Sequence, residues 1–109
     1  MPLDVNQLSR ELVASFGGEL KDYWDDVRQY AEEEANKFAQ SLKDIEDMLS
    51  DGTIGLEKAQ LQIEIQKNAI QTIILTVTGI GKVAAQQAIN SAIGAIRDTV
   101  NQTLRVELL

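Results

Sequence analysis

The sequence predicts an all-α protein, and three observations support this fold class. The only proline is Pro2, so no later residue interrupts a helix by lacking a backbone N–H. Good helix-forming residues dominate a chain that is 44% hydrophobic and 25% charged. Apolar residues recur at steps of three and four in both halves. We therefore expect one domain, residues 1–109, in which a short N-terminal helix precedes a long, unequal helical hairpin that packs into an oligomeric helical bundle.

The first expected element is a short helix over residues 4–16. Asp4 can accept a hydrogen bond at its N-terminus, and Gln7 occupies the capping-box position three residues later. Two successive glycines, Gly17 and Gly18, predict the end of this helix. Its apolar stripe consists of Val5, Leu8, Leu12 and Phe16.

Residues 19–49 are expected to form an amphipathic helix with an acidic, solvated face. The segment that follows, 50–55 (SDGTIG), predicts a loop. It departs from a calcium-binding EF-hand loop, because Leu49 and Lys58 fall where that loop needs a ligand oxygen and a bidentate glutamate. A plain helix–helix turn is the better interpretation. The apolar seam of the helix runs through Leu20, Trp24, Val27, Ala31, Ala35, Phe38, Leu42, Ile45 and Leu49.

Residues 56–105 present a choice between one long helix and a nucleotide-binding loop. The segment from Gly79 to Ala84 fits G-x-G-x-x-A, the turn that holds a dinucleotide pyrophosphate between a strand and a helix. The strand would be 72–78, and Glu107 would be the acid that binds the ribose. A polar stripe favours the helix, because its steps average about 3.7 residues and keep their phase through both glycines. The stripe consists of Glu64, Asn68, Gln71, Thr78, Lys82, Gln86, Asn90, Gly94, Arg97 and Asn101, and Leu75 is the one apolar position that continues its spacing.

A single helix over 56–105 would expose apolar surface. It would be about 75 Å long against about 46 Å for the 19–49 helix, so its apolar flank would overhang. Because burying an isoleucine is worth about 1.5–3 kcal/mol, a second copy of the chain is the expected cover, as a homodimer or higher oligomer. Gly79 and Gly81 are candidate hinges, and the alternative fold is a three- or four-helix bundle with a turn at Gly79–Gly81. The candidate interface consists of Ile70, Ile73, Ile74, Val77, Ile80, Gly81, Ala84, Ala85, Ala88, Ala92 and Ile96.

Composition argues against several classes of function. The chain has no cysteine and no histidine, which excludes disulfides, thiol nucleophiles, Cys/His metal sites and histidine acid–base catalysis. Residues 1–55 hold 13 acidic and 5 basic residues, and residues 56–109 hold 4 and 5. Without clustered basic residues, nucleic acid is not an expected partner. Acidic runs such as 32–34 are expected to be a solvated face, so we expect no enzyme, no metal and no cofactor.

These patterns predict a non-enzymatic helical assembly or protein–protein interaction module that acts through self-association. The first alternative is a membrane-active hairpin whose 69–96 region inserts into lipid, although its polar stripe and Lys82 disfavour a resident spanning helix. The second is a partial dinucleotide-binding βαβ unit. The N-terminus has no basic region followed by an apolar core, so we expect no signal peptide and a cytoplasmic location.

Overall fold

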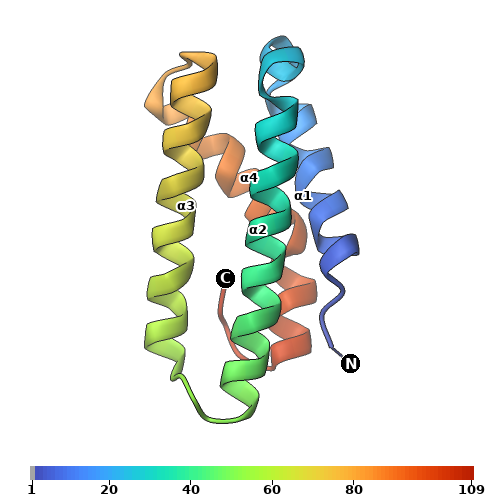
Figure 1. Cartoon of the computed structure of the whole chain (residues 1–109), viewed down its shortest axis with the longest axis vertical. Helices are drawn as coiled ribbons and strands as arrows, with labels where there is room; N and C mark the ends of the chain where they lie inside the picture. The colour runs from blue at the N-terminus through green and yellow to red at the C-terminus, as the bar shows by residue number, and fades with distance from the viewer. Residues whose placement is uncertain (1) are drawn as a thin grey trace.

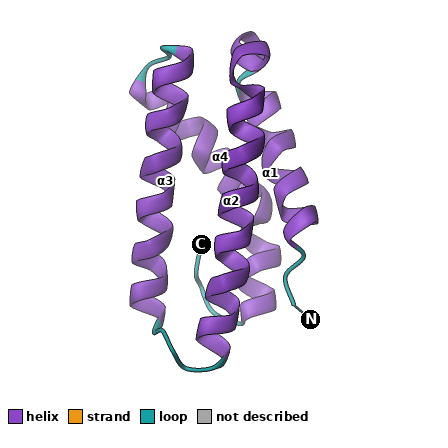
Figure 2. Cartoon of the chain, viewed as in Figure 1, coloured by secondary structure: helices purple, strands orange, loops and turns teal. Residues whose placement is uncertain are grey.

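The computed structural model describes residues 2–109, and its regular structure in this range is helical. The elements are α1 (Val5–Glu19), a short 3-10 helix η1 (Lys21–Tyr23), α2 (Trp24–Ser50), α3 (Leu56–Thr78) and α4 (Lys82–Leu104). Figure 2 shows helices and loops, with no strand, along this part of the chain. The all-α class expected from the sequence is confirmed.

The long helices form an antiparallel bundle, as Figure 1 shows. α1 lies against α2 and α4, and α3 lies against the same two helices from the other side. Short connections join consecutive helices, which is the usual topology of an up-and-down bundle. The described chain measures 42 × 23 × 19 Å along its principal axes.

The expectation of one continuous helix over 56–105 is wrong, and the alternative with a turn at Gly79–Gly81 is confirmed. α3 ends at Thr78, and Gly79 adopts a left-handed conformation with φ of 70°. The Gly79 N–H donates to the Leu75 carbonyl at 2.9 Å, and the Ile80 N–H donates to the Thr78 hydroxyl at 3.2 Å. Gly81 is extended and is the N-cap of α4. Glycine pays no Cβ penalty at a positive φ, so the chain can reverse here.

The reversal also removes the overhang on which the expected oligomer depended. Folding α4 back along the bundle buries its apolar flank inside the same chain, without a second subunit. The polar stripe keeps its phase because each of the two helices carries a solvent-facing side of its own. Periodicity therefore did not distinguish one rod from two antiparallel helices.

The N-terminal elements also differ from their expected bounds. The Asp4 carboxylate caps α1 by accepting from the Gln7 N–H at 3.2 Å, as expected. However, α1 continues through Gly17 and Gly18 to Glu19, so the glycines do not end it. A Cβ built on Gly17 would lie 3.5 Å from the Trp24 indole. This is an ordinary van der Waals distance, so Gly17 lies beside the indole but is not required there by crowding. α2 begins only at Trp24, after η1.

One apolar cluster joins all four long helices of the described chain. α2 buries most of its expected seam, from Val27 to Ile45, and α4 buries a continuous flank from Ala85 to Val100. α3 buries only Ala59, Ile63, Ile70 and Ile74, although it is rich in large apolar residues. Part of its apolar surface therefore remains outside the core.

Both terminal segments are held against the bundle. The N–H of buried Leu3 donates to both carboxylate oxygens of Glu46, at 3.1 and 3.2 Å. Glu46 also accepts from Lys43 Nζ at 2.8 Å, and this hydrogen bond raises the pKa of Lys43 above its ordinary value.

At the other end, the chain turns back after α4 and runs between α4 and α3 (Figure 1). The Asn101 amide oxygen accepts from the N–H groups of Leu108 and Leu109, both at 3.0 Å. Gln60 of α3 donates to the Glu107 carbonyl at 3.0 Å, so the segment also ties α3 to α4.

Candidate interaction surface

The predicted interface residues divide into a buried group and an accessible group. Ile70, Ile74, Ala85, Ala88, Ala92 and Ile96 are buried in the core of the same chain. Ile73, Val77 and Ile80 are half-buried, and Gly81 and Ala84 are exposed. The buried group can contact another subunit only if the bundle opens.

The buried small residues of α4, namely Ala85, Ala88 and Ala92, pack inside the bundle. Gln86, Ile89, Asn90, Ile93 and Arg97 line the hollows between α4 and α3. The alanine side of α4 is therefore turned toward α1, its other neighbour. Small side chains allow two helix backbones to approach closely, which fits an α1–α4 contact within one chain. Ala85, Ala88 and Ala92 of the candidate interface are thus buried within one chain.

The candidate interface predicted from the sequence does not include the most exposed large apolar side chains of α3. Leu61 is 61% exposed and Ile65 is 60% exposed, one helical turn apart. A signal was present in LQIEIQ, where Leu61, Ile63 and Ile65 alternate. One side of a helix cannot bury residues spaced by two, so a helix that buries Ile63 must expose the other two.

Leu61 and Ile65 belong to a longer band, which we call the outer stripe. It consists of Leu61, Ile65, Asn68, Thr72 and Thr76, spaced by three or four residues and all exposed. The Thr72 hydroxyl donates to the Asn68 carbonyl at 3.0 Å, and the Thr76 hydroxyl donates to the Thr72 carbonyl at 2.8 Å. Because these hydroxyls are satisfied by their own helix, the threonines can offer methyl groups to a partner. The stripe is thus more apolar than its composition indicates.

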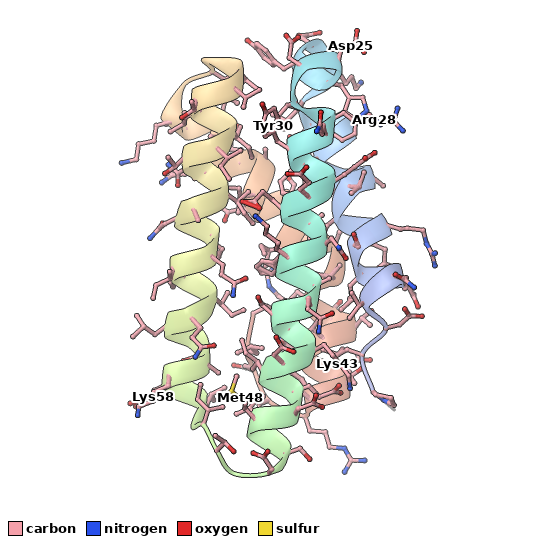
Figure 3. The ribbon with its side chains drawn as sticks, in the orientation of Figure 1. Asp25, Arg28, Tyr30, Lys43, Met48 and Lys58 are labelled. Carbon is pink, nitrogen blue, oxygen red and sulfur yellow. The ribbon has the colours of Figure 1, made fainter. Side chains whose placement is uncertain are left out.

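The outer stripe contains no charged residue, and few charged residues lie near it. α3 carries two acidic and two basic residues, all in its first half, and no charge lies between Lys67 and Lys82. Glu64 pairs with Lys67 at 3.2 Å, and Lys58 extends away from the bundle (Figure 3). The strong negative charge lies instead on residues 1–55. α3 is therefore a neutral side of a protein with a net charge of −7.

The two hinge candidates form the α3–α4 turn, and only one of them is conformationally special. Gly79 has φ of 70°, whereas Gly81 has φ of −65°. A Cβ built on either glycine meets no heavy atom within 4 Å. Backbone conformation, and not crowding, is what distinguishes the two positions.

The structure also bears on the other expected functions. Residues 72–78, the strand required by the βαβ alternative, are the last turns of α3, so that interpretation is wrong. Within residues 2–109, no three acidic side chains group in a way that could hold a metal ion. None of the helices described is both long enough and apolar enough to cross a membrane. Comparisons with protein-family models, curated proteins and solved structures find no significant match to the chain.

Proposed function

We propose that this protein is a non-enzymatic helical interaction module that self-associates through the outer stripe of α3. The observation that carries the proposal is the exposure of Leu61 and Ile65 on a neutral helix face. Contiguous apolar residues on a protein surface commonly mark a contact with a partner. A cytoplasmic location and a coiled-coil-like pairing of two α3 helices belong to the same proposal.

A second copy of the chain is the occupant that the charges favour. Two molecules that each carry a charge of −7 repel one another wherever their acidic halves meet. Approach through α3 brings together surfaces whose charges cancel. A symmetric pair of identical faces is also the commonest way in which soluble proteins form dimers.

If two α3 helices pack antiparallel, the outer stripe of one copy contacts the outer stripe of the other. Around a two-fold axis near Asn68, Leu61 lies opposite Thr76 of the other copy, and Ile65 lies opposite Thr72. Each large apolar side chain would then cover a threonine methyl group. The charged first half of α3 would face the uncharged second half of its partner, so no like charges would oppose each other.

The expected association is weak. Full burial of a leucine or isoleucine contributes about 1.5–3 kcal/mol, and a symmetric pair buries four of them. Association itself costs about 4–15 kcal/mol in lost translational and rotational freedom. We therefore expect a dimer population that depends strongly on protein concentration.

Sedimentation velocity at increasing protein concentration tests the proposal. The wild type should shift from monomer toward dimer, and Leu61→Glu should remain monomeric because it places a charge in each half of the contact. Val83→Glu is the matched control, since Val83 is 68% exposed but lies on α4. A monomer at every concentration, or equal loss of association in both variants, would contradict the proposal.

Disulfide cross-linking tests whether two copies contact each other through α3. The chain contains no cysteine, so Asn68→Cys introduces a single thiol near the proposed axis. Under mild oxidation it should form a disulfide-linked dimer, whereas Val83→Cys should not. If vesicles of neutral or anionic lipid bind the wild type and Leu61→Glu abolishes that binding, the stripe is a lipid-binding surface and the proposal is wrong.

A further inference from the structure

Glu34 of α2 is the buried charged residue in the described part of the chain. It is only 9% exposed, and it lies on the side of α2 that faces α3. Its carboxylate pairs with Lys37 Nζ at 3.4 Å. Because its one partner is an exposed lysine, this carboxylate is available to a cation that enters from the α3 side.

The carboxylate borders a groove of about 610 Å³ between α2 and α3. Phe38 and Ile70 form its apolar floor, and Ser41 and Gln66 belong to its polar edge. The groove extends past Glu34 into a small apolar recess that includes Tyr30, which points from α2 toward α3 (Figure 3). Its volume falls within the range of about 300–1,000 Å³ that is usual for small-molecule sites.

The sequence of α3 explains why the groove exists. Its buried isoleucines Ile63 and Ile70 lie seven residues apart. The helical turn between them offers Gln66 and Lys67 to the bundle instead of a large apolar side chain. One layer of the α2–α3 contact is therefore left unfilled, and Glu34 lies at the end of that layer.

We propose that this groove binds a small organic cation, namely an ammonium group attached to an apolar body. The ammonium would contact Glu34, and the apolar body would lie against Phe38 and Ile70. Lys37 now pairs with the carboxylate, but its side chain is 75% exposed and can move into solvent at little cost. The net charge of −7 favours the approach of a cation and opposes that of an anion.

The proposal is tested by NMR titration of the labelled protein with 2-phenylethylammonium, with 2-phenylethanol as a neutral analogue. Saturable shifts should centre on the amides of residues 34–41 and 66–70. The cation should bind at least about tenfold more tightly than the alcohol. No saturation below about 10 mM, or equal affinity for the two probes, would overturn the proposal.

Variants of this region distinguish binding of the cation in the groove from its nonspecific attraction to the acidic surface. Glu34→Gln should remove the preference for the cation, whereas Glu33→Gln, which removes the same charge from an exposed neighbour, should retain it. Gln66→Trp keeps Glu34 but places a much larger side chain in the groove, so it should weaken the binding of both probes. Cation binding that survives Glu34→Gln and Gln66→Trp, with folding verified by circular dichroism, would contradict the site.

Discussion

Replacing Gly79 by serine is expected to destabilise the protein, whereas the same change at Gly81 is not. Gly79 has φ of 70°, and a residue with a Cβ pays about 1–2 kcal/mol to adopt the left-handed conformation. No steric clash adds to this cost, because a Cβ at either glycine has nothing within 4 Å. The free energy of unfolding of Gly79→Ser should therefore fall by about 1–2 kcal/mol.

Gly81→Ser is a matched control for the turn. Its φ of −65° and ψ of 154° suit any residue, and it is the N-cap of α4. Serine restricts the unfolded chain more than glycine and can cap the helix, so Gly81→Ser should be neutral or should stabilise by about 0.4–1 kcal/mol.

Thermal and urea unfolding followed by circular dichroism measure both variants. A loss of 1 kcal/mol corresponds to a decrease in Tm of about 4–8 °C for a domain near this size. If residues 56–105 were one helix, glycine at position 79 would be unfavourable by nearly 1 kcal/mol relative to alanine, and serine would stabilise the protein. An increase in Tm for Gly79→Ser would therefore refute the turn.

Two further predictions concern the core and the α2–α3 loop. Ala88→Leu overpacks the buried side of α4, so the free energy of unfolding measured in urea should fall by about 1–3 kcal/mol. Ala84→Leu, at an exposed position, should change it by no more than about 0.5 kcal/mol. Equal effects would show that the buried alanines of α4 are not closely packed. In the loop, hydrogen bonds from the Thr53 hydroxyl and N–H lower the pKa of Asp51 below its ordinary value. The stability that these bonds contribute is therefore fully present above the unfolded-state pKa of about 4. It is lost as the pH falls through the lower folded-state pKa. In an NMR titration, Thr53→Val should raise the pKa of Asp51, and an unchanged pKa would contradict this assignment.

The sequence was informative about local structure. Asp4 caps α1, and the apolar seam from Val27 to Ile45 is buried as the three- and four-residue spacing predicted. Such features depend on residues a few positions apart, and both the hydrogen bonds and the helical period act over that range. The helical class follows directly from them.

The sequence was misleading where tertiary contacts decide. Gly17 was predicted to end a helix, but α1 continues through it to Glu19, beside the Trp24 indole, a contact that no local pattern reveals. The polar stripe stays in phase on both sides of Gly79, yet the left-handed conformation of Gly79 lets the chain reverse. The candidate interface then changed, because a reversal at this position turns Ala88 and Ile96 into the core and leaves Leu61 outside.

The distance between the start of α3 and the end of α4 tests the turn most directly. Spin labels on Lys58→Cys and Gln102→Cys, both exposed positions in a chain without native cysteine, report it by pulsed electron paramagnetic resonance. Labelled protein is diluted with unlabelled protein so that only distances within one molecule are measured. The start of α3 and the end of α4 lie at the same end of a bundle that is 23 × 19 Å across, which predicts a label separation below about 30 Å. A single helix would hold the same 44-residue separation at about 66 Å, and that distance would contradict the fold from which the outer stripe and the Glu34 groove are derived.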